Sequence, residues 1–581
     1  MPDDLLLIAA RVETGHPGPP VEALAARDGL ITWIGSAAEA RARRAATVIA
    51  RPDAVALPGL VDAHAHPAWV GEQAELIDLA GARDGAEIVA RVRAAADATD
   101  GTRRGGGDDS ADSDATDGIP RDRVDGIRRG RDARDGIGGI DGINRDRAEG
   151  LDATHGIARD RAEDSDARDP IDRWLRGAGW DEGTWDPPAD PAAALRPLDA
   201  LPRPALLHRV DRHVAWANAA ALAAAGITAA TPDPPGGRIE RDRGGRPTGR
   251  LVDNAIRLVA AAIPPPELDR RRRRLRAALD RFAAAGLTGV HDLCTSAAEL
   301  AAWRALAAEG PLPLRVALYL DADDPALAAV IAEGPASEAA SEAAPHIAGV
   351  KLFADGALGS RSAWLAAPYA DAPHTCGQPI VHGAALITRV ARSAAAGWGV
   401  AVHAIGDAAA RDTVDAFAAA RRAGHRAPLR IEHAQVVDPA TLTRLAGLDV
   451  FAGVQPTHAA ADRPFARARL GARRLAWAYR LRALAAAGAT VLIGSDCPIA
   501  PIDPLGALAA AREGPEALDF DAALAAATRD PARAIGARRG RLAPGWPADV
   551  TLVSADPRLV GFGRVRALAT VVAGRVVSRR L

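Results

Sequence analysis

The stretch Leu60-Val-Asp-Ala-His64-Ala-His66-Pro67 is an apolar strand that delivers two histidines separated by one residue. Successive side chains of a strand point to opposite faces, so this i, i+2 spacing directs both imidazoles to the same side, where they can share one metal ion. A lone pair of this kind is more often incidental than ligating. Its meaning depends on whether later strands bring further ligands to the same place.

The chain past residue 172 alternates short apolar runs with helices rich in alanine, leucine and arginine. This alternation is typical of parallel strands joined by crossover helices, and it predicts an α/β fold, a (β/α)8 TIM-like barrel. Eight strands result if the run at 205–210 belongs elsewhere. Their predicted ends lie near His66, Asp292, Asp321, Phe353, His403, His433, Gln455 and Ser495. Barrel enzymes place their active sites at these carboxyl ends.

Both ends of the chain differ from the barrel region. Residues 1–57 and 540–581 are strand-like, with turn glycines and without helical periodicity. We expect them to pair into one small composite β-sandwich domain, with the barrel occupying residues 58–539.

A low-complexity segment at 98–172 interrupts the apolar pattern. It consists mainly of Asp, Arg and Gly, and it repeats Asp-Gly-Ile at 117, 125, 135 and 141 with irregular spacing. This composition cannot build a core, and the spacing fits neither a solenoid nor a regular calcium-binding repeat, so we expect a disordered insertion. Its flanks, residues 84–96 and the run that begins at Ile171, are expected to be helical.

The composition limits the partners and the location of the protein. Formal net charge is −2, and the acidic residues of the 98–172 segment outnumber its arginines, so we expect neither nucleic acid nor a membrane surface as partner. No secretory signal or membrane-spanning run is visible. The three cysteines are scattered, without the spacing of a thiolate zinc site or the even count of a disulfide framework. We therefore expect a cytoplasmic protein.

Lys351 is the one lysine of the chain, although lysine and arginine together number 72. It lies in Val350-Lys351-Leu352-Phe353, a short apolar strand in which an idle ammonium would be costly. Arginine would keep its charge here, whereas a buried amine can lose its proton and take up carbon dioxide as a carbamate. The carbamate is a carboxylate-like ligand that can bridge two metal ions. The alternative is a chance survivor of a general arginine bias.

Three further strand-like runs each deliver a residue that can ligate metal. Val400-Ala-Val-His403 and Arg430-Ile-Glu-His433 deliver histidines, and Val491-Leu-Ile-Gly-Ser-Asp496 delivers an aspartate. Each of these residues, taken singly, could be a core or capping group. The ordered set of HxH, Lys, His, His and Asp at successive strand ends predicts a metal centre.

This ordered set resembles the amidohydrolase superfamily, and the surrounding motifs resemble its Amidohydro_3 branch, which includes YtcJ-like proteins and N-substituted formamide deformylases. The motifs extend across most of the chain: Leu57-Pro-Gly-Leu-Val-Asp-Ala-His-Ala-His, Gly179-Trp-Asp, His213-Val-Ala-Trp-Ala-Asn218, Pro247-Thr-Gly249, Val350-Lys-Leu-Phe-Ala-Asp-Gly, His403-Ala-Ile-Gly-Asp, Ile431-Glu-His-Ala-Gln, Val454-Gln-Pro-Thr-His458, Gly494-Ser-Asp-Cys-Pro and Gly540-Arg-Leu-Ala-Pro-Gly-Trp-Pro-Ala-Asp549. The 98–172 segment departs from the branch, because it is longer than the usual link at this position.

The resemblance implies a β-domain beside the barrel and an inserted segment at 67–285 after the first barrel strand. It also implies a centre with two divalent metal ions, zinc being the first choice and iron or manganese the alternatives. The implied ligands are His64, His66 and Asp496 for one ion, His403 and His433 for the other, and carboxylated Lys351 as the bridge. A site with fewer metals stays open within the branch.

The function implied is hydrolysis of a non-peptide C–N bond, in an amide or N-substituted formamide, by metal-activated hydroxide. Asp496 would be the catalytic residue, first as base and then as acid. The substrate-binding candidates are residues of the motifs: Trp180, His213, Asp355, Gln455 and His458. Structural roles compete with these assignments, since Trp180 could belong to the core and Asp355 could cap the turn at Gly356.

Two other functions are compatible with the sequence. The same metals could support deamination of a cyclic amidine or nucleobase-like substrate, although deaminase relatives generally use one metal without the lysine. A scaffold or interaction protein could instead act through the 98–172 segment, and deleting that segment would then abolish function. The sequence specifies neither the small-molecule substrate nor whether the chain forms a homo-oligomer.

Overall fold

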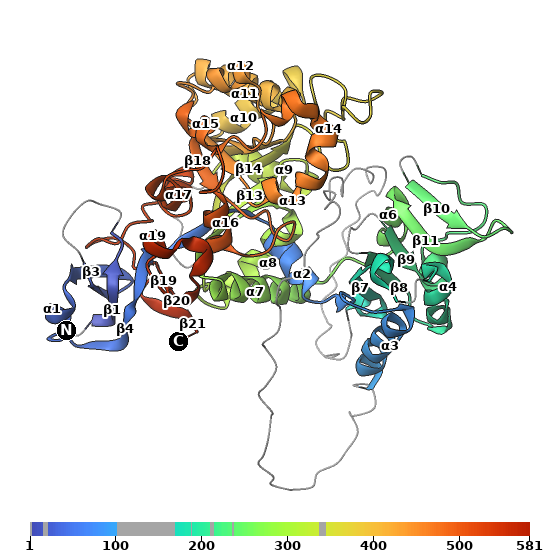
Figure 1. Cartoon of the computed structure of the whole chain (residues 1–581), viewed down its shortest axis with the longest axis horizontal. Helices are drawn as coiled ribbons and strands as arrows, with labels where there is room; N and C mark the ends of the chain where they lie inside the picture. Colours follow the sequence, from blue (N-terminus) through green and yellow to red (C-terminus); the bar gives the residue numbers. More distant parts are fainter. Residues whose placement is uncertain are drawn as a thin grey trace, which may run out of the picture. The chain divides into compact units, whose positions relative to one another are not determined.

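The computed structural model describes residues 3–14, 21–101, 169–186, 189–209, 214–234, 237–335 and 344–580 (Figure 1). Contacts divide the chain into two compact units. The described residues of the first unit lie within 3–74 and 267–580, and those of the second within 75–101 and 169–266. Most of the segment expected to be disordered, residues 102–168, lies outside the described residues. No described helix is long and apolar enough to cross a membrane.

Eight parallel strands form the barrel of the first unit, and their order around the sheet follows their order along the chain. They are β5 (Leu60–Ala65), β12 (Leu287–Thr295), β13 (Arg315–Asp321), β14 (His346–Phe353), β15 (Gly399–Ala404), β16 (Leu429–His433), β17 (Val450–Val454) and β18 (Thr490–Ile493). The ring is nearly closed, because Cys497 forms a parallel bridge with Ala65 and the Asp496 N–H donates to the His64 carbonyl at 2.6 Å. The predicted (β/α)8 TIM-like barrel is confirmed.

Strand periodicity divides the side chains of the barrel between two faces. Val350, Leu352, Val400 and Val402 are at most 1% exposed and belong to the large core that the strands share with the helices. Because successive side chains alternate, Lys351 points to the opposite, inner face of the barrel. The same alternation directs the inner side chains of the other strands toward the site.

Most helices of the first unit pack around the barrel, whereas α1 contacts strands β1 and β2 of the N-terminal region (Figure 1). The helices of this unit are α1 (Ala37–Ala40), α2 (Pro67–Gln73), α7 (Leu268–Ala284), α8 (Ala297–Ala308), α9 (Ala328–Glu333), α10 (Gly383–Ala395), α11 (Asp407–Arg422), α12 (Pro439–Arg444), α13 (His458–Ala461), α14 (Arg463–Leu475), α15 (Leu481–Ala486), α16 (Pro504–Ala510), α17 (Phe520–Ala526), α18 (Arg529–Ala534) and α19 (Pro557–Val560). Local signals fix their positions. In α7, Leu275, Leu279 and Phe282 recur at helical spacing and bury one face, and α8 begins at a capping box formed by Ser296 and Glu299.

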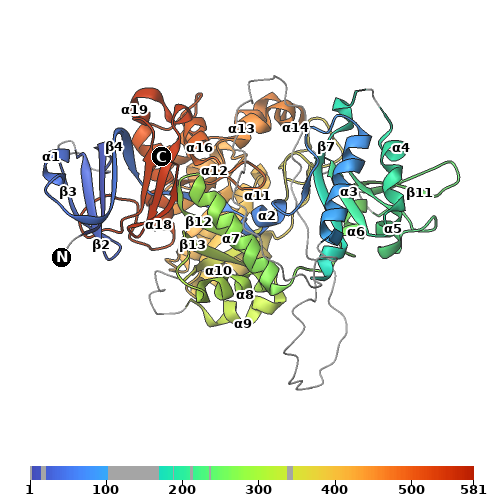
Figure 2. The same ribbon diagram turned by 90° about the horizontal axis from the view of Figure 1, so that it is seen from below.

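The two ends of the chain share one seven-stranded sheet in the order β21-β20-β19-β4-β1-β2-β3. Its strands are β1 (Asp3–Val12), β2 (Ala23–Arg27), β3 (Leu30–Gly35), β4 (Ala45–Pro58), β19 (Val550–Val553), β20 (Ala567–Val572) and β21 (Arg575–Arg579). Strand β4 joins the two ends, because it pairs in parallel with β1 and antiparallel with β19. Figure 2 shows the blue N-terminal strands beside the red C-terminal strands. This sheet is the extra strand domain expected beside the barrel.

The second unit has a six-stranded sheet in the order β10-β11-β9-β8-β7-β6. Its elements are β6 (Ile77–Asp78), α3 (Gly85–Gly101), β7 (Leu175–Trp180), α4 (Pro191–Leu195), β8 (Ala205–Arg209), β9 (Val214–Ala217), α5 (Ala219–Ala224), β10 (Gly237–Arg241), β11 (Pro247–Asp253) and α6 (Asn254–Ala260). The run at 205–210 thus supplies a strand outside the barrel, as the eight-strand count required. The helix expected at 84–96 is present as α3. The helix expected from Ile171 is wrong, because a single 3-10 turn at Pro170–Arg173 leads directly into β7.

Candidate metal centre

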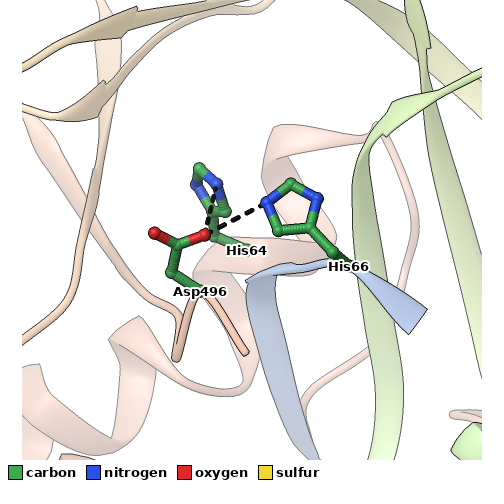
Figure 3. A group of neighbouring side chains, drawn as sticks. All are labelled: His64, His66 and Asp496. Carbon is green, nitrogen blue, oxygen red and sulfur yellow. Dashed lines mark hydrogen bonds and ion pairs between the residues drawn. The ribbon is translucent and has the colours of Figure 1, made fainter. Parts of the chain in front are cut away.

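Three predicted ligands converge at the carboxyl end of the barrel. His64 and His66 come from the end of β5, and Asp496 follows β18, the strand that closes the ring. Asp496 Oδ1 lies 3.1 Å from His66 Nε2 and 3.5 Å from His64 Nε2, and one ligand atom from each residue lies within 4.8 Å of the others. Figure 3 shows both imidazoles directed at the same carboxylate oxygen. This is a three-ligand group of the His/His/carboxylate type that zinc binds.

His403 and His433 lie beside this group, at the ends of β15 and β16. The His433 ring centroid is 4.9 Å from that of His64 and 4.4 Å from that of His403. His433 and Asp496 have φ angles of 67° and 58°, in the left-handed region that non-glycine residues rarely adopt. Such strained backbone persists where the surrounding structure enforces it, and it is frequent at functional sites.

Lys351 is 1% exposed on the inner face of β14. Its Nζ lies 5.0 Å from the centroid of the Phe353 ring, which in turn lies 5.4 Å from the ring of His403. Burial lowers the pKa of the Lys351 amine, although the Glu432 carboxylate opposes this effect. The sole lysine is therefore a buried amine within electrostatic reach of the histidines, because its charge also contributes to lowering the pKa of His64, His403 and His433.

The electrostatics of the site favour neutral imidazoles beside an ionised carboxylate. Burial holds the pKa of His64 and His403 well below the ordinary value and lowers the pKa of His433 to about 4. Burial alone would raise the pKa of Asp496, but the imidazoles of His64, His66 and His433 hold it well below its usual value. Neutral imidazole and carboxylate are the forms of these side chains that bind metal ions.

Two further residues of β16, Glu432 and Arg430, lie beside the predicted ligands and have no role predicted from the sequence. Glu432 Oε2 lies 2.7 Å from His64 Nδ1, and Arg430 donates to Glu432 Oε1 at 2.7 Å. Both side chains are 0% exposed. The signal was present in the motif Arg430-Ile-Glu-His433, because two charged residues at i, i+2 in an apolar strand must face the same buried side.

A small pocket adjoins His433. It encloses about 280 Å³, counting the solvent at its mouth, and its polar lining residues are His433, Gln435, Gln455, His458, Tyr479 and Arg480. Gln455 Oε1 accepts a hydrogen bond from His433 Nδ1 at 2.9 Å, which leaves His433 Nε2 free to bind a metal ion. Gln455 Nε2 and His458 Nε2 are buried and have no hydrogen-bond partner among the described residues. A substrate with acceptor atoms would satisfy these groups.

Comparison with known proteins identifies the family to which this site belongs. The model of the amidohydrolase family, Amidohydro_3, matches residues 143–578. The chain belongs to the amidohydrolase family. It is therefore an enzyme of the hydrolase class that acts on carbon–nitrogen bonds, and the predicted family resemblance is confirmed.

Individual relatives support the same placement of this amidohydrolase. The putative amidohydrolase YtcJ of Bacillus subtilis is 34% identical over 436 residues, which are 71% of this chain and 81% of the relative. The N-substituted formamide deformylase of Arthrobacter pascens is 27% identical over 425 residues, 69% of this chain and 77% of the relative. An uncharacterised metal-dependent hydrolase of known structure from Pyrococcus horikoshii matches with a TM-score of 0.70 and 24% identity, covering 96% of this chain and 99% of that one, which shows the fold.

Two of the other three substrate-binding candidates, Trp180 and Asp355, are buried side chains that already have hydrogen-bond partners. Trp180 is 0% exposed in the core of the second unit, where its indole N–H donates to the Leu207 carbonyl at 3.0 Å. Asp355 is also 0% exposed, and its carboxylate accepts from the backbone N–H groups of Trp364, Ile405 and Gly406. Trp180 thus packs in a core, whereas Asp355 organises a loop and its Oδ1 also lies 3.7 Å from Nε2 of the predicted ligand His403. Their roles in substrate binding stay predictions. His213 lies outside the described residues.

Proposed function

We propose that this amidohydrolase cleaves a non-peptide C–N bond of a small amide or N-substituted formamide by metal-dependent hydrolysis. The observation that carries the proposal is the convergence of His64 Nε2 and His66 Nε2 on Asp496 Oδ1, with two more imidazoles beside them. The formamide deformylase activity in the name of the Arthrobacter pascens relative supports this substrate class.

The residues present fit a pair of divalent ions, with zinc as the first choice. His64, His66 and Asp496 would hold one ion, and His403 with His433 would hold the other. Lys351 would bridge them as a carbamate, because two neighbouring cations need anionic ligands between them and an ammonium would add repulsion. When bound, such ions lower the pKa of water toward ~7 and polarise an amide carbonyl.

The residues of the chain then have separate tasks. Asp496 presents Oδ1 to both imidazoles, while its Oδ2 makes no hydrogen bond to the described residues. Oδ2 is therefore placed to take a proton from the attacking water and to return it to the leaving nitrogen, as general base and then general acid. Because the pKa of Asp496 is held low by the imidazoles, the carboxylate starts in the ionised form that a base requires.

Gln455 and His458 are the substrate contacts that the structure supports best. Their Nε2 atoms are buried, unpartnered among the described residues and part of the pocket beside His433. Neighbouring contacts hold this wall in place, since the Asp462 carboxylate accepts from Gln435 Nε2 at 2.7 Å and from the Tyr479 hydroxyl at 2.6 Å. A fixed wall with unpaired donors selects substrates that present acceptor oxygens.

A metal-dependent hydrolase assay tests the proposal. The full chain is stripped with a chelator, reloaded with Zn²⁺, Fe²⁺ or Mn²⁺, and offered small amides and N-substituted formamides alongside nucleobases. Release of free amine that requires metal is expected, with no ammonia from nucleobases. Ammonia release from nucleobases without amine release would favour a deaminase, and turnover that persists in the metal-free protein would contradict the proposal.

Other assignments also remain proposals. We propose a cytoplasmic location and a small-molecule substrate as the partner, with neither nucleic acid nor membrane involved. The boundaries 1–57 with 540–581 for the β-domain, 58–539 for the barrel and 67–285 for the insertion stay predictions from the sequence, as does disorder of the segment 98–172. A gel-filtration measurement of mass would establish whether the chain forms a homo-oligomer.

A further inference from the structure

The contact between Glu432 and His64 crosses the interior of the barrel. Glu432 lies on β16 and His64 on β5, yet Glu432 Oε2 is 2.7 Å from His64 Nδ1 and both side chains are at most 1% exposed. A carboxylate only accepts hydrogen bonds, so Nδ1 must carry the proton. His64 Nε2, the atom that faces Asp496, is then left with its lone pair free.

Arg430 fixes Glu432 from the other side. Its Nε donates to Glu432 Oε1 at 2.7 Å, and one terminal nitrogen donates to the Ala63 carbonyl at 2.8 Å. The other terminal nitrogen lies 3.1 Å from His291 Nδ1, and the guanidinium carbon lies 4.8 Å from the centre of the Tyr319 ring. Because Arg430 binds both Glu432 and the residue before His64, it ties β16 to β5 at the level of the site.

Two glycines leave the space that this arrangement needs. A Cβ atom on Gly453 would lie 2.2 Å from Glu432 Oε2, and one on Gly494 would lie 2.6 Å from the Cβ atom of His64. Real Cβ atoms do not approach other atoms so closely. The strands on both sides of the contact are therefore built around the Glu432 and His64 side chains.

We propose that Glu432 and Arg430 are positioning residues for the metal centre, with Glu432 setting the orientation and tautomer of His64 and Arg430 holding Glu432 in place. The inference rests on the proposed metal-dependent function. Carboxylate partners of metal-binding histidines fix the ring and its proton, and their loss typically costs about 10–100-fold in metal affinity. Neither Glu432 nor Arg430 belongs to the ligand set itself.

The variant Glu432→Gln tests the proposal with almost no change in size. Each oxygen of Glu432 accepts from a different donor, Oε1 from Arg430 and Oε2 from His64. Glutamine has one oxygen, so one of the two donors would face an amide N–H. We expect the Kd for Zn²⁺, measured on the full chain by competition with a chelator dye at fixed pH, to rise about 10–100-fold.

A second variant addresses the risk that Glu432→Gln fails to fold. The double variant R430M/E432M replaces the buried ion pair by apolar side chains of similar length, a change that proteins often tolerate. We expect it to fold, as judged by circular dichroism, and still to bind Zn²⁺ at least 10-fold more weakly than the wild type. A purely structural pair would leave the Kd unchanged in this variant.

Asp549→Asn provides the matched control. Asp549 pairs with Arg315 in another buried arginine–carboxylate pair of the same unit, at 3.3 Å for both contacts, and contacts none of the predicted ligands. This variant is expected to lower the melting temperature and to keep the wild-type Kd.

If wild-type protein binds no divalent metal, the proposed function and this inference both fail. If the wild type binds Zn²⁺ and the two β16 variants bind it equally well, only this inference is overturned.

Discussion

At the scale of single residues, Lys351 needs an explanation, because it is the one lysine in a chain in which lysine and arginine together number 72. Lys351 is buried on the inner face of the barrel, and its charge reaches three of the predicted histidine ligands. A permanent cation there would weaken metal binding, whereas a carboxylated amine would strengthen it. An amine and a guanidinium are therefore expected to have opposite effects on metal binding at this position.

Lys351→Arg keeps the formal charge and removes the amine. We expect hydrolysis of small amides to fall below detection and the metal content per chain to decrease, because guanidinium cannot be carboxylated. Metal analysis of purified protein and an amine-release assay measure the two effects. Exposed Arg473, changed to Lys, serves as the control and should retain both. Full activity in Lys351→Arg would show that the bridge assignment is wrong.

His458→Phe tests the substrate contact at the same scale. An aromatic ring is retained while the unpaired Nε2 is removed, so the loss should appear in substrate binding. We expect kcat/KM to fall about tenfold, mainly through KM, which corresponds to about 1.4 kcal/mol of hydrogen bonding. The exposed residue His374, changed to Phe, should leave kcat/KM unchanged. An unaltered KM in His458→Phe would exclude His458 from the substrate pocket.

The sequence predicted the candidate metal ligands better than it predicted the roles of the residues around them. The predicted ligands His64, His66 and Asp496 are brought together, because their order along successive strand ends is a chemical pattern. Trp180 and Asp355 belong to motifs too, but a motif does not reveal that one side chain is enclosed in a core and the other is occupied by backbone N–H groups. No role could be predicted for Glu432 and Arg430, because their partners on β5 are distant in sequence and only the fold brings them together.

At the scale of elements, the ends of the eight barrel strands were predicted to within three residues, the largest difference being Asp292 against Thr295 in β12. Parallel strands are buried on both faces, so each is a short, nearly continuous apolar run that stands out from its neighbours. The error at Ile171 has the opposite cause. Strand β7 contains Gly177 and Gly179 and is defined by its pairing with β8, and a short run of this kind has no periodicity that separates strand from helix.

The junction of β12 and α8 leads to a prediction on pH. Asp292 is buried in β12, where its Oδ2 accepts from Trp303 Nε1 of α8 at 3.0 Å, and burial raises its pKa from 3.8 to about 7. Between these values the folded state binds more protons than the unfolded state. The contribution of this group to stability is therefore complete below pH 3.8 and is lost as pH rises through about 7.

Asp292→Asn should remove this contribution to the pH dependence. Urea unfolding of chelator-treated protein at several pH values from 5 to 8 measures it. We expect the free energy of unfolding of the wild type to fall with rising pH, relative to Asp292→Asn, by up to about 1.4 kcal/mol per pH unit inside the window. Parallel curves for the two proteins would mean that Asp292 does not titrate in this range.

At the scale of the whole molecule, the candidate centre belongs entirely to the first unit. His64 and His66 precede the second unit in sequence, and Lys351, His403, His433 and Asp496 follow it. The insertion predicted at 67–285 follows the first barrel strand, and the helices at its two ends, α2 and α7, belong to the first unit, where Arg281 donates to the Val70 carbonyl. Packing of these helices against the barrel is a tertiary property, and composition gave no sign of it.

Deleting residues 102–168 distinguishes the hypothesis of an enzyme from that of an interaction protein acting through this segment. Both flanks can be bridged by a short Gly/Ser linker, because Arg203 donates to the Ala96 carbonyl in α3 and to the Asp172 carbonyl just beyond the segment. All six predicted metal-centre residues lie outside the deletion, so we expect kcat/KM and metal content within about twofold of the wild type, as for surface changes that leave a site intact. The amine-release assay and metal analysis provide both values, and a full-length chain carrying the same linker after Gly101 controls for the linker itself. Loss of turnover in the deletion alone would assign a functional role to the Asp/Arg/Gly segment and would favour the interaction hypothesis over catalysis by the barrel alone.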